Sequence, residues 1–146
     1  RYYFQTFGNF EMLVDDKIVH FQSKKAKELM ALCVYEEGKP VSIHRILEYL
    51  WGDDATSVPA KTGYRRVIKD LSDSLKACGA EEILSREYGS IRVNLDLCDS
   101  DYINFMNGDP RALCLFQGSY MAQYSWAEDM VYKIQERKNI FMRSLK

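Results

Sequence analysis

The stretch Ser57–Cys78, SVPAKTGYRRVIKDLSDSLKAC, decides the fold, because it has the pattern of a long helix with one apolar face and one basic face. Ser57 is suited to the N-cap of this helix, and Pro59 is suited to its first turn. Apolar residues recur three or four positions apart and predict a buried stripe made of Tyr64, Ile68, Leu71, Leu75 and Cys78.

The opposite side of the predicted helix carries cations. Its residues are Lys61, Thr62, Arg65, Arg66 and Lys69. No acid occurs between Ser57 and Asp70, although the net charge of the chain is −1. A helix with cations on its free face is suited to bind an anion, and for a small helical module we expect that anion to be double-stranded DNA. The alternative is a solvated basic face without a partner.

The composition of the chain limits its class. Its 146 residues are enough for one core with an appendage, and a hydrophobic content of 47% indicates an ordered globular protein. No apolar run of about eighteen residues and no secretory leader is present, so we expect a cytoplasmic protein without a membrane partner. Because the net charge is slightly negative, nucleic-acid binding would depend on a local patch.

The sequence contains no pattern that indicates an enzyme or a metal site. The cysteines are spaced too widely for a zinc knuckle, and the two histidines, His20 and His44, stand far apart. A glycine-rich phosphate loop, a nucleophile elbow and a clustered carboxylate pair are all missing. We therefore expect no cofactor, no metal and no catalytic residue, with Cys33 and Cys78 as buried free thiols.

The residues before Ser57 predict a small sheet and two helices. Three short strands are expected over residues 2–7, 10–14 and 17–21, joined by tight turns. A first helix is expected over about 24–37 and a second from a Ser42 cap to near Trp51, with a short strand at Val41. The acidic segment that follows is expected to be an exposed loop before the basic helix, which makes a helix-turn-helix.

The residues after Cys78 predict a hairpin and a helical tail. Strands over 82–85 and 90–94 with a turn over 86–89 form the wing of a winged helix. Arg86, Tyr88 and Arg92 are expected to contact phosphate or the minor groove; the alternative is a ribbon that only seals the core.

Further along, a short helix is expected from Ser100, then a loop containing Pro110 and Gly118, and finally a helix that begins at a Ser125–Glu128 capping box and ends near Ser144. Its stripe is predicted to form a homodimer, with packing inside the chain as the alternative.

Most of the chain resembles the C-terminal effector domain of OmpR-type response regulators, and more closely its variant in the Streptomyces antibiotic regulatory proteins. The matching pieces are TFGNFEMLVDDKIVHF, KKAKELMALCVYEEGKPVSIHRILEYLWGDD, the basic helix and ILSREYGSIRV. The resemblance implies an α+β fold: a winged-helix domain over residues 1–97 with a four-stranded N-terminal antiparallel sheet, three helices and a C-terminal wing, the third helix entering the major groove. Residues 98–146 resemble the start of a bacterial transcriptional activation domain.

The resemblance also implies partners and a role. The loop residues Asp53, Asp54 and Thr56 are expected to contact RNA polymerase. Because the chain begins with Arg1 rather than Met, we expect it to be the effector part of a longer two-component response regulator with a phospho-accepting receiver domain.

The chain departs from the family where Ser72 and Asp73 follow Leu71, since the family usually has Arg directly after that leucine. The sequence thus predicts a sequence-specific DNA-binding transcriptional regulator. The alternative is a protein-interaction scaffold with a degenerate winged helix that does not bind DNA.

Overall fold

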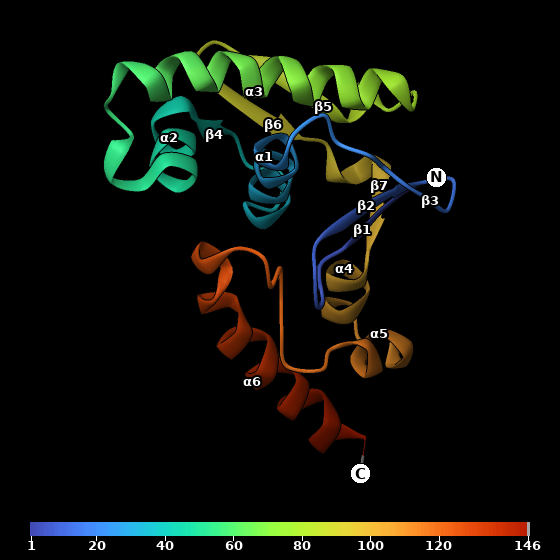
Figure 1. Ribbon diagram of the computed structural model, residues 1–146. Coiled ribbons are helices and arrows are strands. Elements are labelled where there is room, and N and C mark those ends of the chain that lie inside the picture. Colours follow the sequence, from blue (N-terminus) through green and yellow to red (C-terminus); the bar gives the residue numbers. More distant parts are fainter. Residues whose placement is uncertain (146) are drawn as a thin grey trace. The chain divides into compact units, whose positions relative to one another are not determined.

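The protein has an α+β fold whose contacts divide the chain into two compact units (Figure 1). A computed structural model describes residues 1–145. The central unit is Val19–Leu97, and the terminal unit joins Arg1–Ile18 to the segment from Cys98 onward. The sequence-based division placed the first strands with the winged helix, whereas the structure groups them with the C-terminal segment, because β1 pairs with a strand that follows Leu97.

Three helices form most of the central unit, and their starts match the sequence prediction. They are α1 (Lys24–Tyr35), α2 (Ile43–Trp51) and α3 (Val58–Ala77), with 3₁₀ turns at Gly52–Asp54, Glu81–Ile83 and Leu95–Leu97. Each α-helix begins after a serine whose side chain accepts a hydrogen bond from the backbone N–H three residues on, which confirms the caps expected at Ser42 and Ser57. Helix α1 ends two residues before the predicted end, since Glu37 has a φ of 59°.

The central unit also contains a three-stranded sheet in the order β4-β6-β5. Its strands are β4 (Val41–Ser42), β5 (Leu84–Glu87) and β6 (Ser90–Val93). The predicted four-residue turn over 86–89 is wrong, because Arg86 pairs with Ile91 and Glu87 pairs with Ser90. The loop of the hairpin is therefore only Tyr88 and Gly89, and Gly89 has the positive φ of 78° that glycine tolerates best.

The core of the central unit lies between the three helices and β6. Leu29 and Leu32 of α1, Ile46 of α2 and Leu71 of α3 have no exposed surface. Burial of four such side chains contributes on the order of 1.5–3 kcal/mol each. The Cys33 thiol is also fully buried, and this burial raises its pKa to about 12, so the group stays protonated.

A four-stranded sheet in the order β3-β2-β1-β7 organises the terminal unit. Its strands are β1 (Tyr2–Gln5), β2 (Glu11–Val14), β3 (Lys17–Ile18) and β7 (Cys98–Ser100). Strand β1 is antiparallel to β2 but parallel to β7, so the sheet is mixed. The predicted strand over 17–21 is wrong beyond Ile18, because only Lys17 and Ile18 pair with β2; His20 lies outside any strand.

The helices of the terminal unit depart further from the prediction. They are α4 (Asp101–Met106), α5 (Pro110–Leu115) and α6 (Asp129–Ser144), with a 3₁₀ turn at Ser125–Ala127. The cap at Ser100 is confirmed, but the segment expected to be a loop around Pro110 forms α5, whose cap is Asp109. The Ser125 capping box is wrong as well: no side chain caps the start of α6, and the residues before it form the 3₁₀ turn.

A buried carboxylate and an aromatic cluster hold the terminal unit together. Asp101 is 2% exposed and accepts hydrogen bonds from the backbone N–H of Thr6 (2.9 Å) and of Phe7 (2.9 Å) and from the Thr6 hydroxyl (2.7 Å). Burial raises the pKa of this carboxyl, and the hydrogen bonds partly oppose that shift. Phe105 packs edge-to-face against Phe7 and Phe141.

The apolar stripe predicted for α6 is buried in part. Met130 and Ile134 are buried, and the Phe141 ring lies 5.9 Å from that of Phe105, whereas Leu145 is 63% exposed. Packing inside the chain therefore accounts for most of the stripe, and a dimer through this helix stays a prediction. No helix within residues 1–145 combines the length and the apolar composition needed to cross a membrane.

Candidate nucleic-acid interface

Helix α3 is held in place by its buried side and by a tryptophan at its first turns. Ala60, Val67, Ile68 and Leu71 are buried. Gly63 packs against the Trp51 ring so closely that an added Cβ would lie 2.9 Å from Trp51 Cζ2. The absence of a side chain at this position thus lets α2 and α3 approach each other.

Two polar contacts add to this support. Lys25 lies over the Trp51 ring, with its Nζ 4.9 Å from the ring centre, and donates a hydrogen bond to the carbonyl oxygen of Leu50 (2.6 Å). At the other end of α3 the buried Ser74 hydroxyl donates to the Asp70 carbonyl and accepts from the Gln22 N–H. The helix is therefore fixed near both ends.

The predicted apolar stripe of α3 is correct at three positions. Ile68, Leu71 and Leu75 are buried, but Tyr64 and Cys78 are only half-buried. Ala60 and Val67 are buried in their place, so the buried face of α3 is turned slightly about the helix axis relative to the predicted face. The predicted cations still lie on the solvent side.

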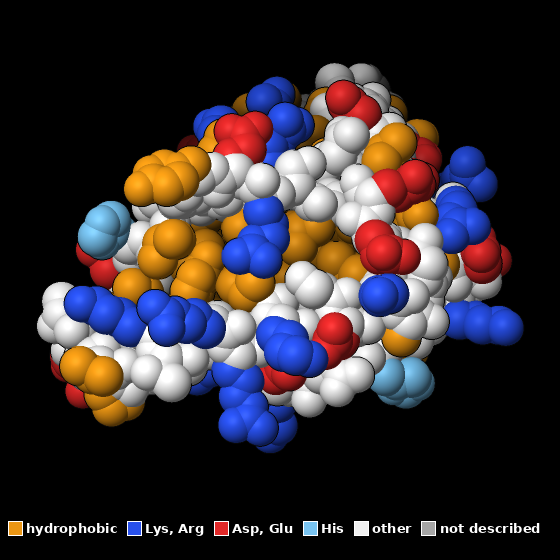
Figure 2. Space-filling view, turned by 90° about the horizontal axis from the view of Figure 1, so that it is seen from above, with side chains coloured by type: hydrophobic (Ala, Val, Ile, Leu, Met, Phe, Trp, Pro, Cys, Tyr) orange, Lys and Arg blue, Asp and Glu red, His pale blue; other side chains and the backbone are white. Residues whose placement is uncertain are grey.

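The predicted cationic residues do share one exposed surface, which we call the basic face: Lys61, Thr62, Arg65, Arg66 and Lys69. Figure 2 looks onto the side of the molecule that carries α3 and shows Lys and Arg side chains standing along it. Across the described residues 1–145, neither Arg65 nor Arg66 forms an ion pair. Both guanidinium groups are therefore available to an external anion.

Lys69 differs from the two arginines, because it is already engaged. Its Nζ lies 2.8 Å from Asp73 Oδ2, one helical turn further along α3. The hydrogen bond to Asp73 raises the pKa of Lys69 and keeps its charge, but the pair is exposed and weak. A ligand phosphate can therefore replace the Asp73 carboxylate only by competing with it.

One cation on this side of α3 was missed by the sequence prediction. Lys76 is exposed and lies seven residues after Lys69, which places both on the same face of the helix. Helical spacing places it on this face, but Asp70 and Asp73 interrupt the run of cations, so the charge pattern indicates only the N-terminal half of the helix.

Of the three hairpin residues predicted to contact DNA, only Arg86 lies in another place than predicted. Arg86 lies on β5 rather than in the turn, and its pairing with Ile91 places it on the sheet face that carries the buried Ile91 and Val93. Arg92 points to the opposite face, where it is half-buried and its Nε is enclosed without a hydrogen-bond partner in the described part of the chain. Tyr88 alone occupies the tip, and it is fully exposed.

The segment between α2 and α3 is exposed as predicted. Asp53, Asp54 and Thr56 all lie at the surface, and Asp53 and Asp54 are part of the 3₁₀ turn Gly52–Asp54. Within residues 1–145 no cluster of three His, Cys, Asp or Glu side chains could hold a metal ion.

Comparison with known proteins finds a similarity in structure but not in sequence. No protein-family model matches the chain, and no curated protein matches it. Among solved structures, the chain is similar to EmbR of Mycobacterium tuberculosis in complex with a low-affinity phosphopeptide, with a TM-score of 0.77 at 17% identity. The match covers 97% of this chain and 44% of EmbR, so the chain spans less than half the length of that protein. The similarity shows that this chain and the matched part of EmbR share one fold, which is α+β.

Proposed function

We propose that this chain is a DNA-binding transcription regulator whose α3 enters the major groove. The observation that carries the proposal is the basic face of α3, where Arg65 and Arg66 are exposed and have no carboxylate partner among the described residues. The winged-helix fold presents such a helix to DNA, and phosphate contacts from Lys and Arg supply most of the affinity. The similarity to EmbR supports the same class of protein.

The proposal assigns roles along α3. Arg65 and Arg66 lie in the N-terminal half of α3, and between them they contact base edges and phosphates. Lys61 and Thr62 contact the DNA backbone. The partial positive charge at the N-terminus of the helix adds to the attraction for phosphate. Tyr88 at the hairpin tip reaches the sugar–phosphate backbone or the minor groove.

Further partners belong to the same proposal. The exposed loop with Asp53, Asp54 and Thr56 contacts RNA polymerase, and the exposed residues at the end of α6 form a homodimer. The role as effector part of a two-component response regulator, with a receiver domain and phosphorelay, is a proposal of the same kind.

Anisotropy of a labelled mixed-sequence duplex tests DNA binding directly. We expect affinity that falls steeply with added salt, and Arg66→Glu should reduce it by about tenfold to a hundredfold, because a phosphate or base contact becomes a repulsion. Lys133→Glu is the matched control: it makes the same charge change at an exposed site on α6. Equal binding by Arg66→Glu and the parent would show that α3 does not enter the groove.

A protein-interaction scaffold is the second candidate, and one observation favours it. The Lys69–Asp73 pair reduces the free positive charge in the middle of α3, where Asp70 lies as well. A scaffold would fail to bind the duplex at every salt concentration, whereas a weakened DNA-binding protein would bind at low salt.

A further inference from the structure

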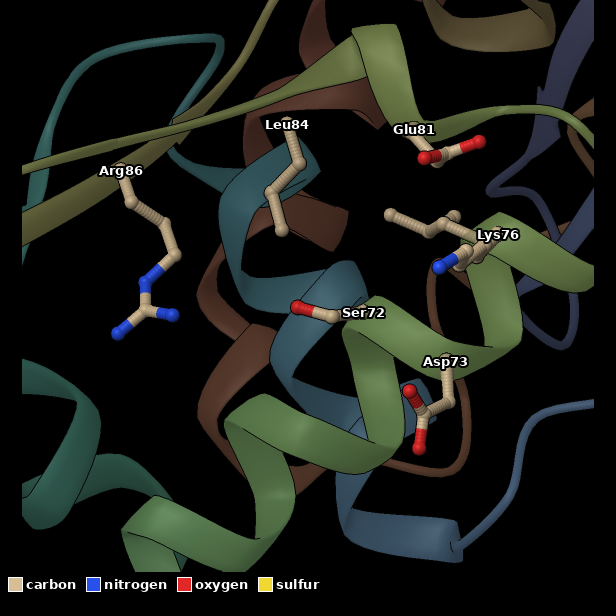
Figure 3. Close-up of a pocket in the computed structure, with 7 residues that line it drawn as sticks. Ser72, Asp73, Lys76, Glu81, Leu84 and Arg86 are labelled. Carbon is tan, nitrogen blue, oxygen red and sulfur yellow. The ribbon is translucent and has the colours of Figure 1, made fainter.

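A groove of about 340 Å³ lies next to the basic face, between the C-terminal half of α3 and β5. Leu75 and Leu84 contribute apolar surface to it, and Ser72, Lys76 and Arg86 contribute polar groups. In Figure 3, Arg86 extends from β5 at one end, Lys76 and Glu81 lie at the other, and Ser72 and Leu84 lie between them. The small Ser72 side chain leaves this space open.

Two cations and two carboxylates line the groove, and one of the carboxylates is paired with a lysine outside the lining. Asp73 lines the groove, but its Oδ2 is held by Lys69 at 2.8 Å. Lys76 and Arg86 form no ion pair within residues 1–145, and Glu81 has none either. Two free cations therefore face one free carboxylate, and the free cations stand at both ends of the groove.

The register of the hairpin explains why Arg86 reaches this groove. Residues two apart on a strand share a face, so Arg86 projects on the same side as Leu84. The Arg86 charge is also close enough to lower the pKa of the Tyr64 phenol on α3, although burial of Tyr64 outweighs this effect. Arg92, on the other face, is not part of the lining.

We propose, building on the proposed function, that this groove holds the sugar–phosphate backbone of one strand of the duplex that α3 binds. Arg86 and Lys76 contact successive phosphates, the Ser72 hydroxyl donates to one of them, and a deoxyribose packs on Leu84. The groove opens on the side of α3 that carries Lys69 and Lys76. One DNA strand can therefore run from the basic face directly into the groove.

Two features of the groove favour a DNA backbone as its occupant. Cations at both ends with apolar surface between them match the alternation of phosphate and sugar along a strand. In addition, the proposed contacts go to phosphates and to a sugar, and such contacts position the duplex without selecting its sequence.

Salt-dependent binding of the full chain to one labelled duplex tests the inference. Arg86→Ala and Lys76→Ala should each weaken binding about threefold to tenfold and lower the magnitude of the salt slope by about 0.9, the value for one lost phosphate contact. The loss should be the same for duplexes of different sequence. Arg86→Lys should restore the slope, and Lys133→Ala, which removes a cation from α6, should leave it unchanged.

The outcomes separate this inference from the proposed function. If Arg66→Glu abolishes binding while Arg86→Ala and Lys76→Ala keep the parent slope, the groove does not hold the strand and α3 still binds DNA. If the parent chain binds no duplex at low salt, both proposals are wrong. Circular dichroism and the urea midpoint of each variant identify any loss that comes from misfolding.

Discussion

The central unit is built from one continuous segment of chain, whereas the terminal unit joins two segments that are far apart in sequence. In the central unit, helices capped by nearby serines bury a shared core and leave their cations outside. In the terminal unit, residues near the N-terminus receive their polar contacts from beyond residue 97: Asp101 binds Thr6 and Phe7, and the Gln123 side chain exchanges two hydrogen bonds with the Phe10 backbone.

This difference predicts that the two units respond separately to substitution. The contacts that hold α3 come from a continuous segment, so we expect the surface proposed to bind DNA to depend on the central unit alone. The terminal unit depends on a few long-range polar contacts, and we expect it to be the part that a single substitution can loosen. The predictions below test whether the two units respond independently.

The largest expected effect is that of Asp101→Asn on the terminal unit. The Asn side chain has one acceptor oxygen and would turn an N–H₂ group toward the N–H donors of Thr6 or Phe7, so we expect a loss of about 3 kcal/mol. Native-state hydrogen exchange should show this loss at the Thr6 and Phe7 amides, with the amides of α3 unchanged. Asp96→Asn, at an exposed carboxylate, is the control.

An equal loss of protection at the α3 amides would contradict this comparison, because the two units would then unfold together. Duplex binding by Asp101→Asn adds a second measure. It should remain close to that of the parent if the basic face needs only the central unit.

The same contrast explains how much could be predicted from the sequence. Helix α3 and its cap at Ser57 were predicted because the signals lie within a few residues of one another. The role of Asp101 was not, because its partner Thr6 is 95 positions away and no local pattern links them. The KIVHF strand was predicted too long for a related reason: its apolar Val19 is buried, but in the central unit rather than in the sheet.

The candidate site was predictable in its helix but not in its hairpin. The basic face follows from helical spacing. The alternating residues over 82–85 and 90–94 predict two strands, but they do not fix where the turn begins. The first strand lies two residues later than predicted, and this shift moves Arg86 from the predicted tip to the strand. Hydrogen-bond register, which depends on the whole hairpin, decided which arginine faces the groove.

A smaller effect is expected from Gly63→Ala, which acts on the central unit alone. The new Cβ would lie 2.9 Å from Trp51 Cζ2 and 3.4 Å from Cε2, so the indole or α3 must shift. We expect a loss of about 1–2 kcal/mol in the free energy of unfolding. Trp51 fluorescence, measured in a Trp126→Phe background, should change, while hydrogen exchange in the terminal unit should not.

Thr62→Ala is the control for this variant, since Thr62 neighbours Gly63 but lies on the exposed side of α3. It should leave Trp51 fluorescence unchanged. An unaltered spectrum for Gly63→Ala itself would mean that the contact between α2 and α3 is looser than the structure shows.

The smallest expected effect is that of Asp73→Asn on DNA binding. Lys69 then loses the carboxylate 2.8 Å from its Nζ and becomes free for a phosphate, so we expect a gain in affinity of about threefold and a salt slope steeper by about one contact. Glu136→Gln removes the same charge from exposed α6 and should change neither quantity by as much. If both variants gain equally, overall charge explains the effect. If neither gains, Lys69 does not face the duplex, and the contacts of α3 are confined to its N-terminal half.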